Sequence, residues 1–180
     1  MNKKIAVFCS AMPVDEKYIK PTQEFGVLMA KNGFDLVWGG TDRGLMKVIA
    51  EAVKLGGGKL YGVSVIAYQQ QLKSDADEMI VAKTLGERKA LFLEKSDAIV
   101  CLVGGIGTLD EITEIIELRK QKHHEKPIVI LNTENFYEGF KTQLQKMRED
   151  RFFSFNIDDF VFFADSPKEA IDYINQKLKS

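Results

Sequence analysis

Short apolar runs alternate with stretches of helical spacing along the whole chain. The runs are apolar at nearly every position, whereas the stretches between them repeat their apolar positions every three or four residues. A continuous apolar run is typical of a strand in a parallel sheet with both faces covered. The predicted strands cover residues 4–9, 34–38, 59–66, 78–82, 98–103, 127–132 and 160–164, and the predicted helices cover residues 15–31, 44–55, 84–95, 108–121, 136–149 and 166–178.

This alternation predicts an α/β fold, in which a single Rossmann-like domain spans residues 1–180. We expect a doubly wound parallel sheet with helices on both faces. A length of 180 residues fits one domain with a sizeable core. Ligands of such sheets bind at the carboxyl ends of the strands, so that edge is the first place to look for a site.

The composition excludes several classes of partner. The net charge is −1, which gives no electrostatic reason to expect binding to nucleic acid or to an anionic membrane. No window reaches the roughly 18 apolar residues of a membrane span, and no signal peptide opens the chain, so a cytoplasmic location is the simplest expectation. Cys9 and Cys101 lie in apolar runs and are predicted to be small buried side chains. No metal site is predicted, because further ligands at suitable spacing are lacking.

Glycines gather where two of the predicted strands end. The segment VGGIGT contains Gly104, Gly105 and Gly107, and WGGTDRG contains Gly39 and Gly40. Glycine lets the backbone approach a ligand closely, and the helix that follows offers unpaired N–H groups with a partial positive charge. These features predict an anion site, most simply for a phosphate. The alternative is a tight turn without a ligand.

The glycine pattern also limits the kind of phosphate ligand. No GK[ST] follows GGIGT, so the segment is not a P-loop. The dinucleotide fingerprint is broken, because Asp110 occupies its third glycine position and the first strand–helix turn has no glycine. A single phosphate therefore fits better than a pyrophosphate.

Glu111 has two interpretations. Thr108 to Glu111 has the spacing of a capping box, in which Thr108 begins the helix and Glu111 binds back to it, worth about 1 kcal/mol. The same spacing recurs at Ser166–Glu169 and at Thr84–Glu87. Spacing alone leaves cap and catalyst equally open for Glu111. Its position after the glycines, at the ligand edge, favours chemistry.

Arg88 and Lys89 are the second candidate group. They lie near the start of a predicted helix, where the helix dipole disfavours cations. This placement indicates an anionic partner, either a phosphate or Glu111. The alternative is a solvated basic pair.

Taken together, these segments resemble the Lonely Guy (LOG) family, long labelled "possible lysine decarboxylase". The resemblance depends on GERK at residues 86–89 and VGGIGTLDE at residues 103–111, which are similar to the family's RK pair and PGGxGTxxE signature. VWGGTDRGLM and IAVFCS resemble further family segments, so the likeness covers residues 4–131. Val103 replaces the signature proline, Gly86 replaces a histidine, and Gln70 lies near a position where many relatives have glutamate.

The resemblance implies a phosphoribohydrolase that cleaves the N-glycosidic bond of a cytokinin riboside 5′-monophosphate or of AMP, releasing the base and ribose 5-phosphate. It implies a homodimer or larger homo-oligomer, and no cofactor. A decarboxylase would need a pyridoxal phosphate Schiff base, which nothing in the sequence marks. By analogy, Glu111 and Arg88 are the catalytic residues. The predicted substrate-binding residues are Gly40, Thr41, Lys89, Gly104, Gly105, Ile106, Gly107, Thr108 and Asp110.

Two other functions stay open. The first is a non-catalytic nucleotide carrier or sensor with the same fold, since molybdenum cofactor carriers resemble this family and hold a phosphorylated pterin at the glycine loop. The Arg88–Glu111 pair distinguishes the two, because a carrier does not require it. The second and weaker alternative is a nucleotide-binding oxidoreductase, against which the broken dinucleotide fingerprint argues.

Overall fold

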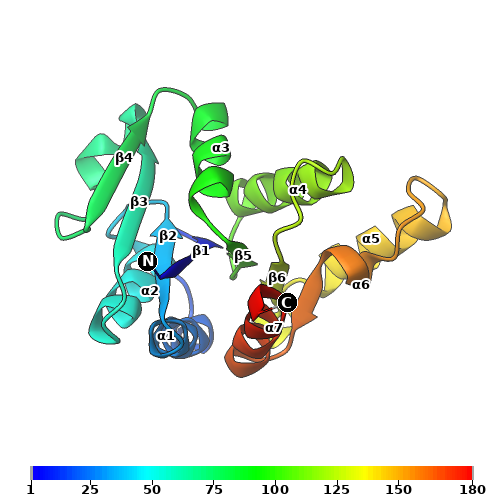
Figure 1. Ribbon diagram of the computed structural model, residues 1–180, viewed down its shortest axis with the longest axis horizontal. Helices are drawn as coiled ribbons and strands as arrows, with labels where there is room; N and C mark the ends of the chain where they lie inside the picture. Colours follow the sequence, from blue (N-terminus) through cyan, green and yellow to red (C-terminus); the bar gives the residue numbers. More distant parts are fainter. Residues whose placement is uncertain (1, 180) are drawn as a thin grey trace.

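The computed structural model describes residues 2–179, and its elements follow the predicted alternation (Figure 1). The strands are β1 Lys3–Phe8, β2 Phe34–Trp38, β3 Leu60–Val65, β4 Glu78–Ala82, β5 Ala98–Cys101, β6 Ile128–Leu131 and β7 Phe162–Ala164. The helices are α1 Glu16–Lys31, α2 Gly44–Leu55, α3 Leu85–Lys95, α4 Ile106–Lys120, α5 Glu138–Glu149, α6 Ile157–Phe160 and α7 Pro167–Lys179, with short 3-10 helices η1 Ile66–Gln71 and η2 Thr133–Asn135.

All seven strands form one parallel sheet in the order β4-β3-β2-β1-β5-β6-β7. From β1 the chain winds outward through β2 and β3 to β4, and then returns to place β5 on the other side of β1. The strand order therefore reverses between β1 and β5, which is where open α/β sheets bind ligands. The predicted doubly wound, Rossmann-like fold is confirmed.

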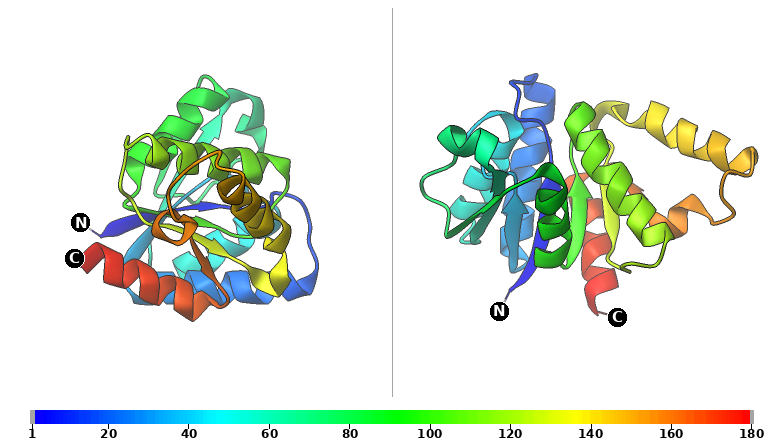
Figure 2. Two further views of the ribbon diagram at one scale, coloured as in Figure 1. Left: turned by 90° about the vertical axis from the view of Figure 1, so that its right-hand side faces the viewer. Right: turned by 90° about the horizontal axis from the view of Figure 1, so that it is seen from above.

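Helices cover both faces of the sheet, as Figure 2 shows. One core packs α1, α2 and α7 against the sheet, and the other packs α3 and α4 against the opposite face. Trp38 is fully buried in the first core and Phe92 is 1% exposed in the second. Every residue of β2 is buried, which explains why its run shows no alternation.

The two remaining capping-box spacings fall at real helix starts. Thr84 caps α3 by accepting a hydrogen bond from the Glu87 N–H at 3.1 Å. Ser166 accepts from the Glu169 N–H at 3.2 Å at the start of α7. In both motifs the glutamate reaches one residue further back than in a strict capping box, because the N–H of Lys83 donates to Glu87 and the N–H of Asp165 donates to Glu169, each at 2.8 Å.

The segment from α5 to α6 departs most from expectation. The helix α5 begins at Glu138 instead of residue 136, and the predicted strand 160–164 is shortened to Phe162–Ala164 by the unpredicted helix α6. In Figures 1 and 2, α5 and the following loop project from the edge of the sheet beyond β6 and β7. An apolar groove of about 300 Å³ lies between α4 and this projection, and its lining includes Ile116, Leu144, Phe153 and Phe155.

Across residues 2–179, no helix combines the length and apolarity needed to span a bilayer.

Candidate active site

A cavity of about 420 Å³ opens at the carboxyl edge of the sheet, at the point where the strand order reverses. The ends of β1, β2 and β5 meet there, together with the starts of α2 and α4 and one turn of α3. A ligand at this place would contact residues that are far apart in the sequence. The lining residues are Cys9, Ser10, Ala11, Met12, Gly39, Thr41, Met46, Tyr68, Arg88, Gly105, Ile106, Gly107, Thr108 and Glu111.

Arg88 of α3 and Glu111 of α4 form an ion pair in this cavity. The Arg88 Nη1 lies 2.7 Å from the Glu111 Oε1, and each side chain is only about a tenth exposed. Two further contacts fix the guanidinium: its Nε donates to the Val63 carbonyl at 2.9 Å, and its carbon lies 4.9 Å from the Phe92 ring centre. The carboxylate is therefore presented to the cavity in a defined orientation.

The interpretation of Thr108 and Glu111 as a capping box is wrong. The helix α4 begins at Ile106 with Gly105 as its N-cap, so Thr108 lies inside the first turn. The glycines permit this early start, because a Cβ on Gly104 would lie 2.1 Å from the Thr108 Oγ1. Glu111 consequently points away from the helix start and binds Arg88 instead of the backbone.

Of the two glycine-rich strand ends, only the one at α4 leaves its helix start open. At α2, the Ser10 carbonyl accepts hydrogen bonds from the N–H groups of Leu45 at 2.9 Å and Met46 at 3.4 Å. At α4, the N–H groups of residues 106–108 have no hydrogen-bond partner among the groups that the structure describes. Unpaired N–H groups at a helix start form an anion site.

Burial changes the proton affinity of the acidic groups in the cavity. Desolvation raises the pKa of Glu111 above its ordinary value, and the adjacent Arg88 offsets part of that rise. The carboxyl can therefore take up and return a proton closer to neutral pH than an exposed glutamate. Burial also raises the pKa of the Cys9 thiol well above its ordinary value, with a further contribution from Glu111, so Cys9 is a neutral thiol in the cavity wall.

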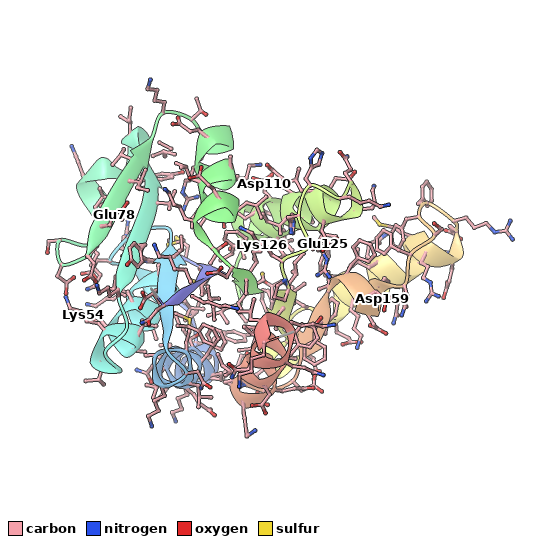
Figure 3. All side chains as sticks on the ribbon, in the orientation of Figure 1. Lys54, Glu78, Asp110, Glu125, Lys126 and Asp159 are labelled. Atoms are coloured by element: carbon pink, nitrogen blue, oxygen red, sulfur yellow. The ribbon has the colours of Figure 1, made fainter. Side chains whose placement is uncertain are left out.

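Most of the residues predicted to form the site line the cavity. Arg88 and Glu111 do so together with Thr41, Gly105, Ile106, Gly107 and Thr108. Four predicted residues do not. Gly40 and Gly104 form the supporting backbone, and Lys89 pairs with Asp110 at 3.2 Å and also with Glu114. Figure 3 places Asp110 at the end of α4 that faces α3, so this second ion pair joins the two helices outside the cavity.

Seven cavity residues were not among the predicted site residues: Cys9, Ser10, Ala11, Met12, Gly39, Met46 and Tyr68. Tyr68 belongs to η1, a 3-10 helix in the polar stretch between the predicted strands 59–66 and 78–82, where no helix was predicted. An aromatic residue in a polar segment next to a strand end is the signal that could have identified it. Within residues 2–179, no group of three or more His, Cys, Asp or Glu side chains is arranged to hold a metal ion.

Comparison with known proteins places these residues in a family. The family described as "Possible lysine decarboxylase" matches residues 46–174. A cytokinin riboside 5′-monophosphate phosphoribohydrolase of Mycobacterium tuberculosis is 32% identical over 169 residues, which cover 93% of this chain and 90% of that protein. The Arabidopsis thaliana enzyme of the same name, LOG1, is 31% identical over 98% of this chain and 86% of its own length. These relatives support an enzyme of the phosphoribohydrolase family.

Solved structures with the same fold include proteins of another kind. The molybdenum cofactor carrier protein of Chlamydomonas reinhardtii has a TM-score of 0.74 at 24% identity, with full coverage of both chains. The molybdenum cofactor binding protein of Rippkaea orientalis has a TM-score of 0.77 at 20% identity, covering 99% of this chain and 98% of that one. At these identities the likeness shows the fold alone. By its sequence relatives, the chain belongs to the Lonely Guy family, the family described as possible lysine decarboxylases.

Proposed function

We propose that the protein hydrolyses the N-glycosidic bond of a nucleoside 5′-monophosphate. The observation that supports this most is the buried Arg88–Glu111 pair, which faces the same cavity as the open start of α4. In this proposal the 5′-phosphate binds the N–H groups of residues 106–108 and the Thr108 hydroxyl. The phosphate is remote from the bond that breaks, so its binding aligns the sugar against Glu111.

The proposed reaction breaks the bond between C1′ of the ribose and a ring nitrogen of the base. Departure of the base makes the sugar oxocarbenium-like, and the Glu111 carboxylate stabilises the developing charge. Glu111 also accepts a proton from the attacking water. The water oxygen bonds to C1′, and the water proton ends on the departing base, giving the free base and ribose 5-phosphate. Arg88 orients Glu111 and keeps it ionised.

A carrier of a phosphorylated pterin is the second candidate, and it is favoured by the likeness to the molybdenum cofactor carrier structures. The open start of α4 would serve either function. A carrier gains nothing from a buried carboxylate paired with an arginine, because burying both charges costs free energy that binding alone does not require. The Arg88–Glu111 pair therefore favours the hydrolase.

The experiment that separates the two functions is a chromatographic assay for free base. We expect the protein to release base from AMP or from isopentenyladenosine 5′-monophosphate, which tests the AMP nucleosidase and cytokinin-activating forms of the proposal. Adenosine, which lacks the phosphate, is the matched control and is expected to react far more slowly. No release from either monophosphate, with AMP still raising the melting temperature, would favour the carrier.

Tyr68 is expected to contact the base. The segment after β3 is held at the cavity because the Lys73 N–H donates to the Gly40 carbonyl at 2.8 Å, and Thr41 pairs with Leu72. The start of α4 follows β5 and η1 follows β3, and these two strands are three strand spacings apart in the sheet. The distance between the two segments is therefore about 14 Å, which is comparable to the length of a nucleoside monophosphate. Tyr68 is 44% exposed and lines the cavity, so its ring is available for stacking.

We predict that Tyr68→Ala raises the KM for AMP roughly tenfold with little change in kcat, because stacking of a base on an aromatic ring contributes about 1–3 kcal/mol. Tyr68→Phe retains the ring and should have a KM close to that of the unmodified protein. Steady-state kinetics on both variants test the prediction. Equal losses in the two variants, or none in Tyr68→Ala, would show that the base does not stack there.

The homodimer is a prediction that follows from the resemblance alone, and the cytoplasmic location stays a prediction from the sequence. Light scattering on the purified protein is expected to give a mass of two or more chains.

A further inference from the structure

Tyr137 lies directly beneath the turn that connects β5 to α4, although it comes from the segment after β6. It is 2% exposed, and its hydroxyl donates to the Leu102 carbonyl at 2.8 Å. The same hydroxyl accepts from the Cys101 thiol at 3.3 Å and interacts with the backbone of Gly104. Groups from residues 101, 102 and 104, at the entry to the turn, thus contact one oxygen atom.

The position of Tyr137 is itself fixed. Its backbone N–H donates to the side-chain oxygen of Asn132 at 2.7 Å, a contact that is buried. Its ring packs edge-to-face on Phe136, with the ring centres 5.0 Å apart. A buried hydrogen bond of this kind costs about 1–3 kcal/mol to break when one partner is left unsatisfied. The tyrosine is therefore a rigid support for the backbone above it.

Other contacts support the opposite side of the same turn. The Leu102 N–H donates to the Phe8 carbonyl at 2.9 Å, and the Ser10 N–H donates to the Val103 carbonyl at 3.0 Å. These bonds extend the ladder between β1 and β5 past the end of the strand. Among the described residues, no backbone carbonyl accepts a hydrogen bond from the N–H groups of residues 106–108 at the start of α4. Where those groups point is consequently set by residues 102–104.

The direction of the hydrogen bonds does not change over the working pH range. Burial raises the pKa of the Tyr137 hydroxyl far above its ordinary value, so it stays protonated and donates to Leu102. Burial raises the pKa of the Cys101 thiol to about 12, so the thiol also keeps its proton. Tyr137 therefore donates to Leu102, and the Cys101 thiol donates to Tyr137 at 3.3 Å or to the Leu102 carbonyl at 3.5 Å.

We propose that the Tyr137 hydroxyl is a positioning group that sets the direction of the α4 N–H groups toward the phosphate of the ligand. Tyr137 does not line the cavity and acts through the turn. The inference rests on the proposed function only in assigning a phosphate to the start of α4. Small displacements of groups that position a ligand have large effects on its binding and reaction, which is why one remote hydroxyl matters.

The test compares Tyr137→Phe with the unmodified protein in calorimetric titrations with three probes: ribose 5-phosphate, AMP and adenosine. We expect the affinity for ribose 5-phosphate and for AMP to fall about tenfold, by analogy with the cost of small misplacements. The affinity for adenosine should stay the same. Tyr173→Phe is the matched control, because Tyr173 of α7 stacks on Phe162 of β7, away from the turn, and its ring is retained. It should bind all three probes as the unmodified protein does.

An equal loss for adenosine would overturn the proposal, since Tyr137 would then support the whole cavity. Unchanged affinity for both phosphate probes in a folded Tyr137→Phe protein would overturn it too. If Tyr137→Phe does not fold, Asn132→Ala loosens the same tyrosine by removing its backbone acceptor, and a loss confined to the phosphate probes is again required. The readout needs no turnover. If the affinity for ribose 5-phosphate depends on Tyr137 but the protein releases no base, the proposed hydrolase function is contradicted and this inference stays intact.

Discussion

Glu111→Gln is expected to lower the kcat for base release by about 10²- to 10⁴-fold, the usual contribution of a general acid or base. Glutamine has nearly the shape of glutamate and can still accept the hydrogen bond that Arg88 donates at 2.7 Å. It cannot take a proton from water, and it carries no charge to stabilise the sugar. The Kd for AMP should change little, because the proposed phosphate site is formed by residues 106–108.

The matched control for this variant lies one turn further along α4. Glu114→Gln makes the same chemical change at a carboxylate that pairs with Lys89 outside the cavity. It should keep the activity of the unmodified protein, and both variants should keep a cooperative thermal transition. If Glu111→Gln retains more than about a tenth of the kcat, a loss too small for a general base, the carboxylate is not the catalyst. The proposed mechanism would then fail even if base release itself is observed.

The strands could be predicted because their burial is nearly complete. β1, β2, β5 and β6 lie in the middle of the sheet between two helical layers, so almost every position needs an apolar side chain. The segment from α5 to α6 lacks this constraint. Its helices contact the rest of the domain on one side only. A helix as short as Ile157–Phe160 also contains too few residues to show a helical periodicity. The sequence pattern is therefore weakest where the chain leaves the sheet.

The site could be predicted in part, because some of its residues lie in short segments with a recognisable sequence pattern. Arg88 and Glu111 lie in two sequence motifs, GERK and VGGIGTLDE, whose glycines and charges can be recognised in the sequence. The parallel topology brings both residues to one edge of the sheet. Lys89 was assigned to the cavity because it neighbours Arg88. Adjacent residues on a helix point in different directions, and Lys89 faces Asp110 and Glu114 instead. Tyr68 was missed because only tertiary contacts bring η1 back over the turn at Gly40.

The second large effect is expected for Arg88→Met. Methionine retains the apolar packing on Phe92 but removes the guanidinium that binds Glu111 and the Val63 carbonyl. Removing one partner of a buried ion pair costs about 3–5 kcal/mol, because the remaining charge is left uncompensated. For a chain of this length, each 1 kcal/mol lowers the melting temperature by about 2–4 °C. Lys89→Met removes a more exposed ion pair and should lower the melting temperature much less.

The effect of Arg88→Met on pH dependence follows from the pKa of Glu111. Arg88 lowers a pKa that burial raises, so its removal leaves the burial effect unopposed and the pKa of Glu111 rises further. The acidic limb of the kcat/KM profile reports the protonation of a catalytic carboxylate, and we expect it to move to higher pH in the variant. Lys89→Met should move it only slightly, because Lys89 contributes less than Arg88 to the same pKa. An acidic limb that stays in place would show that Glu111 is not the group that titrates in the reaction.

The same shift gives the stability of Arg88→Met a definite pH dependence. A carboxyl whose pKa is higher in the folded than in the unfolded chain contributes stability that is fully present below the unfolded pKa, and that contribution is lost as the pH rises through the folded pKa. The pKa of Glu111 is already raised in the unmodified protein, and more so without Arg88. Relative to the unmodified protein, the variant should therefore lose less stability at pH 5 than at pH 8, as thermal melts at the two values would measure. In the double variant Arg88→Met with Glu111→Gln, no carboxyl remains at position 111, so this difference should disappear. Its persistence would assign the pH dependence to another group.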